Sequence, residues 1–158
     1  MQEIIWTKVF LTVYPRLERL VEEFDNAREN LLKSGIGVYL GRRLTNEELF
    51  EKIIDVNYRR LGLINVKVLV DEGMRRLPQK AREVLQARYF DKSVNTYCEA
   101  KDVSKRTFFR RLDSATRRLG EVLISLGYDE RKILLEYKNE PILIRIKERL
   151  ELNHSKSS

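Results

Sequence analysis

The chain has 158 residues, of which 42% are hydrophobic and 35% charged, a balance typical of folded globular domains rather than disordered chains. Its formal net charge of +7 favours a polyanionic partner. The single cysteine, Cys98, excludes an internal disulfide and a cysteine-based zinc site, and no apolar run approaches the roughly 20 residues of a membrane span. We therefore expect a protein of the reducing cytoplasm without a membrane partner.

Residues 1–74 predict a helical N-terminal unit, whose role the sequence does not reveal. Helical spacing in residues 1–33 is interrupted by Pro15, so we expect two helices that meet at Tyr14-Pro15 or one helix that kinks there. We interpret the apolar stripe after the proline as intramolecular core, and a homodimer through these N-terminal helices is the alternative. The stripe consists of Leu17, Leu20, Val21, Phe24, Ala27, Leu31 and Leu32.

The segment 34–44 contains three glycines and predicts a loop. Its glycine spacing misses the dinucleotide-binding fingerprint by one residue and follows a helix instead of a strand, so we expect no nucleotide site. Thr45 and Glu48 have the spacing of a capping box, which predicts a helix over 46–60. The apolar residues of this helix are expected to point inward: Leu49, Phe50, Ile53, Ile54 and Tyr58.

Gly62 predicts a turn or break after this helix. The following stretch, 63–76, contains valines at alternate positions, as a strand would. We nevertheless expect a helix there, because no second strand is visible with which it could pair.

The middle of the chain, 75–127, predicts a helix-turn-helix domain. The first helix begins at Leu77-Pro78, and one of its faces carries Ala81, Val84, Leu85, the aliphatic stem of Arg88, and Tyr89. A short helix over 94–101 places Cys98 where the two neighbouring helices cross and a small side chain is needed. Asp102 is suited to a left-handed turn, Val103 to the core between the helices, and Ser104 to the N-cap of the last helix.

The last helix, 104–119, is expected to be amphipathic. At about 100° per residue, Phe108, Leu112, Ala115 and Leu119 share one side, and Arg106, Arg110 and Arg117 lie opposite. Between Arg75 and Arg118 thirteen basic residues stand against five acidic ones, so the rest of the chain carries no positive surplus. Arginines on a solvated helix face need not bind anything, but this local surplus favours DNA over that alternative.

Arginine matches the guanine edge in the major groove, whereas Lys105, Arg111 and Arg118 are better placed for phosphates. Phe109 either packs against the preceding helix or touches a thymine methyl group. The predicted DNA-binding residues are Lys105, Arg106, Thr107, Phe109, Arg110, Arg111, Arg117 and Arg118.

The stretch LPQKAREVLQARYF, followed by VSKRTFFRRLDSATRRL, resembles region 4 of bacterial RNA polymerase sigma factors. The resemblance implies binding to the upstream, minus-thirty-five promoter element and contact with the polymerase flap. It also implies that Lys105, Arg106, Phe109 and Arg110 face the groove, with Thr107 and Arg111 at the backbone. Residues 1–74 do not resemble the rest of a sigma factor, which favours a regulator of phage or mobile-element type.

An alternative function is a protein-interaction module that docks RNA polymerase or another acidic partner without binding DNA. We do not expect an enzyme, because the single histidine, His154, lies near the C-terminus and Cys98 occupies a predicted core position. No cofactor or metal site is expected either.

The C-terminal part, 128–152, predicts two helices over 130–137 and 140–152, the second capped by Asn139 with Pro141 in its first turn. Residues 153–158 are expected to form a frayed or disordered tail. The sequence as a whole therefore predicts an all-α fold divided at 1–74, 75–127, 128–152 and 153–158.

Overall fold

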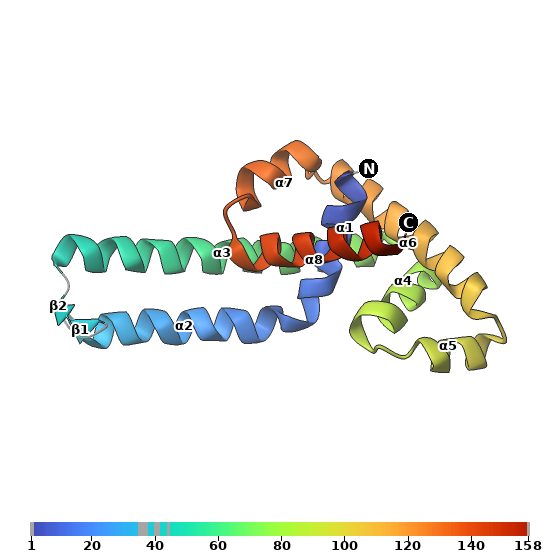
Figure 1. Cartoon of the computed structure of the whole chain (residues 1–158), viewed down its shortest axis with the longest axis horizontal. Helices are drawn as coiled ribbons and strands as arrows, with labels where there is room; N and C mark the ends of the chain where they lie inside the picture. The colour runs from blue at the N-terminus through green and yellow to red at the C-terminus, as the bar shows by residue number, and fades with distance from the viewer. Residues whose placement is uncertain (1, 35–37, 40–41, 44, 158) are drawn as a thin grey trace. The chain divides into compact units, whose positions relative to one another are not determined.

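The computed structural model describes residues 2–34, 38–39, 42–43 and 45–157, and the fold is all-α, as predicted (Figure 1). Val38–Tyr39 (β1) and Arg42–Arg43 (β2) pair as two-residue antiparallel strands in the segment expected to be a loop. None of the helices in these ranges is long and apolar enough to cross a membrane. The α-helices are α1 (Gln2–Val13), α2 (Leu17–Ser34), α3 (Asn46–Arg76), α4 (Gln79–Leu85), α5 (Val94–Lys101), α6 (Lys105–Ser125), α7 (Glu130–Tyr137) and α8 (Pro141–Ser157).

The prediction of a helix junction at Pro15 is confirmed. Helix α1 ends at Val13, a 3-10 turn (η1, Tyr14–Arg16) contains the proline, and α2 begins at Leu17. Proline lacks the amide hydrogen that an uninterrupted helix would need at this position, so the chain changes direction here.

The fold forms two compact units that divide the predicted N-terminal unit 1–74. The larger unit comprises the chain up to Pro15 together with Val68 and everything after it, and the smaller unit is Arg16–Lys67. These units divide the chain elsewhere than at the predicted boundary of residue 74. The physical reason is that α1 is rich in apolar residues that need cover: Trp6, Val9, Phe10 and Leu11 are fully buried, and α1 packs against α6, α7 and α8.

In the smaller unit, α2 and the first part of α3 lie side by side (Figure 1). Asp25 on α2 forms ion pairs with Arg28 and Arg60, and the guanidinium of Arg59 lies 4.7 Å from the ring centre of Phe24. Helix α3 continues through Gly62, where we predicted a break. Glycine in a helix interior costs only about 1 kcal/mol relative to alanine, and no proline is present to stop the helix.

The expectation that the apolar residues of 46–60 point inward is only partly correct. Leu49 and Ile53 are half-buried, but Phe50, Ile54 and Tyr58 are exposed. Phe50 and Ile54 lie about 100° farther around the axis of α3 than Leu49 and Ile53. The apolar arc of α3 is therefore wide, and α2 covers only one side of it. On α2 the predicted stripe is buried or half-buried except for its last member, Leu32.

The C-terminal helices differ from the prediction at both ends of α8. Asn139 is not the cap, because α8 begins at Pro141 and the carboxylate of Glu140 accepts a hydrogen bond from the Ile142 amide at 3.4 Å. The tail prediction is also wrong, since α8 extends through Ser157; Ser158 lies outside the described residues. Lys147 pairs with Glu151 one turn later, which supports the helix toward its end.

The core of the larger unit includes the inner side of α6 and the last turns of α3. Leu112, Leu119 and Leu123 are buried there, with Phe108 at the start of the same stripe. At Gly73 a β-carbon would lie 2.6 Å from Cδ1 of Leu119, so the absence of a side chain allows α3 and α6 to approach each other closely.

Candidate nucleic-acid interface

Helix α4 continues beyond Leu85 as a π-helical turn (η2, Gln86–Phe90), so the first helix of the predicted domain has an irregular last turn. The Asp91 amide donates to the carbonyl of Gln86 at 2.8 Å, a five-residue spacing. A π turn contains one residue more than an α turn and shifts the residues after it around the axis. Ala87 is therefore buried and Arg88 exposed, which corrects the prediction that the Arg88 stem packs inward.

The connection between α5 and α6 has the predicted backbone geometry. Asp102 adopts the left-handed conformation, with φ 53° and ψ 53°, and Ser104 Oγ accepts a hydrogen bond from the Thr107 amide at 3.1 Å. Cys98 and Val103 are half-buried instead of fully buried. The turn and the cap are local features, because each depends on hydrogen bonds between residues close in sequence.

The inner face of α6 is the one that the sequence predicted. Phe108, Leu112, Ala115 and Leu119 are buried. The ring of Tyr97 on α5 meets Phe108 edge-on at 5.2 Å between centres, a favourable aromatic arrangement. This contact fixes α5 against the first turns of α6 and directs the opposite face of α6 outward.

Three cations project from the N-terminal end of α6. Lys105, Arg106 and Arg110 are exposed, and none of them forms an ion pair with a carboxylate among the residues that the structure describes. Phe109 packs on its own helix and next to η2, and a contact with a thymine methyl group stays a prediction. Its ring packs on Phe108 and lies 5.9 Å from the Arg88 guanidinium, yet 43% of the residue is exposed.

Thr107 is held by the cap and is only half-exposed. Its amide donates to Ser104 Oγ, and its hydroxyl accepts a hydrogen bond from the same oxygen at 3.2 Å. A ligand could reach the threonine only at the edge of the first turn.

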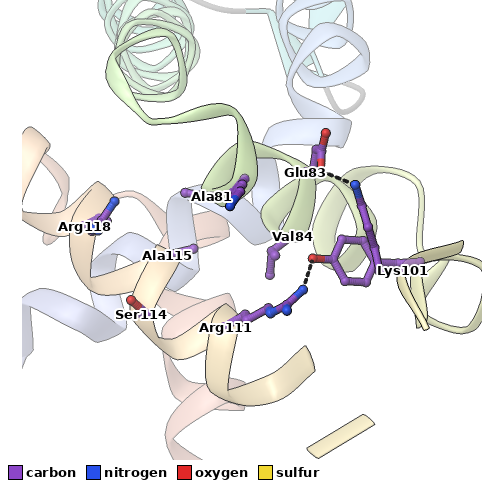
Figure 2. Close-up of a pocket in the computed structure, with 10 residues that line it drawn as sticks. Ala81, Glu83, Val84, Lys101, Arg111, Ser114, Ala115 and Arg118 are labelled. Carbon is purple, nitrogen blue, oxygen red and sulfur yellow. Dashed lines mark hydrogen bonds and ion pairs between the residues drawn. The ribbon is translucent and has the colours of Figure 1, made fainter. Parts of the chain in front are cut away.

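Arg111 and Arg118 lie on one flank of α6, beside a hollow of about 380 Å³ between α4, α5 and α6 (Figure 2). Arg111 donates to the hydroxyl of Tyr97 at 3.2 Å. Lys101 pairs with Glu83 at 3.2 Å, and this ammonium group lowers the pKa of the Glu83 carboxyl. The basic side chains that line the hollow are Lys80, Lys101, Arg111 and Arg118.

A second basic hollow, of about 460 Å³, lies on the other flank of α6. Its lining includes Arg88, Lys92 and Lys105, the hydroxyl residues Ser93 and Thr96, and no acidic side chain. Sequence reasoning missed Arg88 and Lys92 as site residues, and it also missed Lys80 and Lys101 in the first hollow. The sequence does contain a signal for these four residues, namely the surplus of basic residues in 75–118. Our sequence interpretation attributes this surplus almost entirely to the last helix.

Arg117 does not join the other candidates. It lines a separate hollow with Lys8 of α1 and with Glu151 and His154 of α8. Asp113 is in the same lining, so this part of α6 offers mixed charge. The structure thus groups seven of the eight predicted residues around the exposed end and flank of α6 and places Arg117 apart from them, because α1 and α8 pack beside its turn of the helix.

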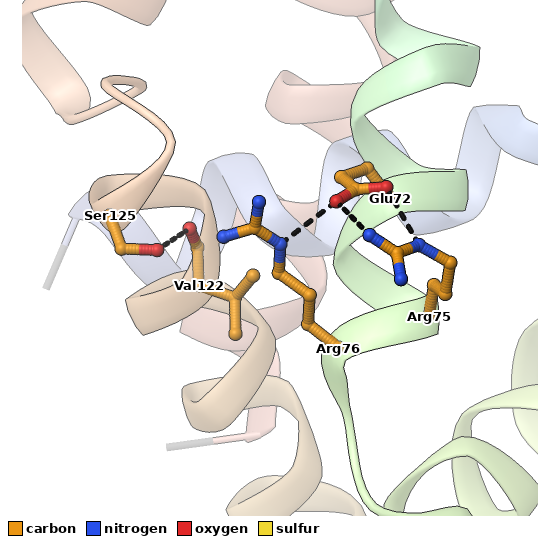
Figure 3. Close-up of polar contacts among 5 residues, drawn as sticks. All are labelled: Glu72, Arg75, Arg76, Val122 and Ser125. Carbon is orange, nitrogen blue, oxygen red and sulfur yellow. Dashed lines mark hydrogen bonds and ion pairs between the residues drawn. The ribbon is translucent and has the colours of Figure 1, made fainter.

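Arg75 and Arg76 contribute less free positive charge than their number suggests. Both guanidinium groups bind Glu72, at 2.6 and 2.9 Å (Figure 3). Their hydrogen bonds lower the pKa of the Glu72 carboxyl from 4.5 to about 2, so this side chain is ionised at neutral pH. The available charge is therefore concentrated on α6 and its two flanks.

No family model, curated protein or solved structure matches the chain. Within the described residues no group of three or more histidine, cysteine, aspartate or glutamate side chains could hold a metal ion. The site must therefore be interpreted from its own geometry, which offers exposed cations on α6.

Proposed function

We propose that this chain is a DNA-binding transcription regulator and that α4, α5 and α6 form its helix-turn-helix, with α6 in the major groove. The observation that carries the proposal is the distribution of charge around α6. Arg106 and Arg110 project between two flanks, and each flank has a basic hollow. A helix in the major groove meets base edges at its tip and a phosphate backbone on either side, which is the same arrangement.

Each group of residues has a separate role in this proposal. Arg106 and Arg110 would read base edges, since a guanidinium can donate two hydrogen bonds to guanine O6 and N7. Lys105, with Arg88 and Lys92, would neutralise one phosphate strand. Arg111 and Arg118, with Lys80, would neutralise the other, because Lys101 is already paired with Glu83.

The resemblance to sigma region 4 supports the same interpretation and adds RNA polymerase as a second candidate partner. In that case the chain would be presented to a promoter by polymerase, in the manner that the resemblance implies. DNA binding by the free chain does not depend on this addition.

The test is selection from random duplex DNA by the full chain at moderate salt, followed by binding measurements on the enriched sequence. Arg106→Ala and Arg110→Ala should each weaken binding by about 1–3 kcal/mol and relax preference at one position. Lys92→Ala should weaken binding to all sequences alike and reduce the salt slope by about one unit. Arg149→Ala is the matched control, since it removes an exposed arginine from α8, far along the chain from this face.

Two outcomes would contradict the proposal. Unchanged affinity in the Arg106→Ala/Arg110→Ala double variant would show that α6 does not read DNA through this face. The second outcome is that the selection enriches no DNA sequence, while the affinity for RNA polymerase or another acidic protein does not change with salt concentration. This outcome would favour the protein-interaction module, because the affinity for phosphates falls steeply with salt.

A further inference from the structure

The smaller unit leaves a continuous apolar face of α3 exposed. The exposed fractions of its members are 65% for Phe50, 52% for Ile54, 67% for Tyr58 and 61% for Leu61. At about 100° per residue these four side chains fall within roughly 80° of arc. We call them the α3 stripe.

The α3 stripe is separate from the side of α3 that packs on α2. The contacts with α2 come from Asn57, Arg59 and Arg60, which reach Arg28, Phe24 and Asp25. Around the axis of α3, the mean angular position of these three residues is about a third of a turn from the mean position of the stripe. Formation of the α2–α3 hairpin therefore leaves the stripe uncovered.

We propose that the α3 stripe pairs with the same stripe of a second copy of this chain, antiparallel, so that two hairpins form a four-helix bundle. This proposal uses other residues than the proposed DNA interface, so either can fail while the other holds.

The size of the face fits a dimer contact. Two aromatic and two aliphatic side chains, each more than half exposed, present roughly 500 Å² of apolar surface. Single exposed apolar residues are normal on a protein surface, whereas this patch has the size of the largest apolar patch on a typical monomer, which is often functional. With a polar rim it approaches the roughly 800 Å² per partner of a standard interface.

The spacing of the stripe suits pairing with itself. Its members follow one another at steps of four, four and three residues, and the reversed order is three, four and four. A two-fold axis near residue 56 would therefore place Phe50 beside Leu61 of the partner subunit and Ile54 beside the partner's Tyr58. Such an isologous contact covers every member of the stripe on both copies.

The helix dipoles favour the antiparallel direction. An antiparallel pair opposes the dipoles of the two copies of α3, whereas a parallel pair aligns them. Arg59 and Arg60, the basic residues nearest the axis, contact Phe24 and Asp25 of α2 and therefore do not face a second copy.

The first test is the mass of the full chain in solution, measured by light scattering or sedimentation at roughly micromolar concentrations and above, the weak end of the affinity range of specific interfaces. We expect two chains per particle for the wild type and one for Ile54→Lys. Leu135→Lys on α7 is the matched control, since Leu135 is 66% exposed but lies outside the stripe, and it should remain a dimer. Circular dichroism of each variant checks that it is folded.

A wild type that stays monomeric would overturn the proposal and leave the stripe to a different partner. A folded Ile54→Lys variant that remains dimeric would show that the chains associate through another surface.

Cross-linking tests the direction in a Cys98→Ser background, which removes the native cysteine. Ile54→Cys should cross-link to itself because it lies near the axis. Phe50→Cys should cross-link only when mixed with Leu61→Cys. Efficient self-linking by Phe50→Cys would overturn the antiparallel arrangement.

Discussion

Helices α6 and α3 are both long and carry both charged and apolar residues, but the fold covers opposite kinds of surface on them. On α6 the apolar stripe from Phe108 to Leu119 is buried, and the exposed end carries Arg106 and Arg110. On the 46–67 part of α3 the exposed stripe is apolar, and Arg60 is drawn into an ion pair with Asp25. Uncovered charge favours a polyanion, and uncovered apolar surface favours another protein face. The comparison therefore supports a different kind of proposed partner for each of the two helices.

The largest effect is expected from the buried side of α6. Phe108→Ala removes a fully buried ring and should lower the free energy of unfolding by about 3–5 kcal/mol. Phe109→Ala, one residue later and partly exposed, should cost much less. Urea unfolding of both variants measures the difference, and equal losses would mean that α6 is not oriented as described.

A smaller effect is expected where α3 and α6 approach each other. Gly73→Ala places a β-carbon 2.6 Å from Leu119 Cδ1, and overpacking of this kind costs about 1–3 kcal/mol. In a Leu119→Ala background the clash is absent, so the same substitution should stabilise by about 1 kcal/mol through helix propensity. A double-mutant cycle of unfolding free energies tests this reversal of sign, and additive values would contradict the close contact.

The N-caps of the two helices allow a closer comparison. Ser104 Oγ accepts from the Thr107 amide, and Thr45 Oγ1 accepts from the Glu48 amide, both at 3.1 Å. Removing either hydroxyl by Ser104→Ala or Thr45→Ala should cost about 1 kcal/mol of stability. Only Ser104→Ala should also weaken DNA binding, because only α6 carries the proposed reading face. Ser104→Asp is the control, since it should restore the cap. An equal loss of DNA affinity in Thr45→Ala would contradict the assignment of the reading face to α6 alone.

The smallest effect is expected from Glu72. Its pKa is lowered from 4.5 to about 2 by Arg75 and Arg76, so its contribution to stability is present above pH 4.5 and lost as the pH falls toward 2. The carboxyl is only half-buried and solvent screens its interactions, so the change should be slight. Thermal unfolding of wild type and Glu72→Gln between pH 2 and 7 should show curves that converge at low pH. A constant offset across this range would mean that the arginines do not depend on the charge of Glu72.

Glu72→Gln also sharpens the assignment of charge. The substitution frees two arginines from their carboxylate and should slightly raise affinity for nonspecific DNA, mainly at low salt. Sequence preference should not change, because Arg75 and Arg76 lie outside the proposed reading face.

Prediction from the sequence was most successful where structure depends on neighbours along the chain. The helix junction at Pro15, the left-handed turn at Asp102 and the cap at Ser104 are set by backbone geometry and by hydrogen bonds within a few residues. The buried side of α6 was also predictable, since its apolar repeat is narrow and unbroken. The sequence predicts Asn139 as the cap of α8, whereas Glu140 fills this role in the structure. The prediction fails because both side chains can accept a hydrogen bond near Pro141.

The candidate site was predicted less completely than the fold. Seven of the eight predicted residues gather around the exposed end of α6, but Arg88, Lys92 and Lys80 join them from elements that periodicity had assigned to packing or turns. For Arg88 the cause is a π turn, which shifts the helical register by one residue without a clear mark in the sequence. Arg117 was misplaced because nothing in its own helix shows that α1 and α8 pack beside it.

The sequence by itself determined that the fold is all-α, where most of the helices begin, and that positive charge is concentrated in residues 75–118. These properties follow from local propensity, capping and composition. Only the tertiary structure decided that α1 belongs with the C-terminal helices, that two hollows flank α6, and that Phe50, Ile54 and Tyr58 remain exposed. Whether a helix face is covered depends on residues far away in the chain. The periodicity of one helix shows how wide its apolar arc is, but it does not show which part of that arc another element covers.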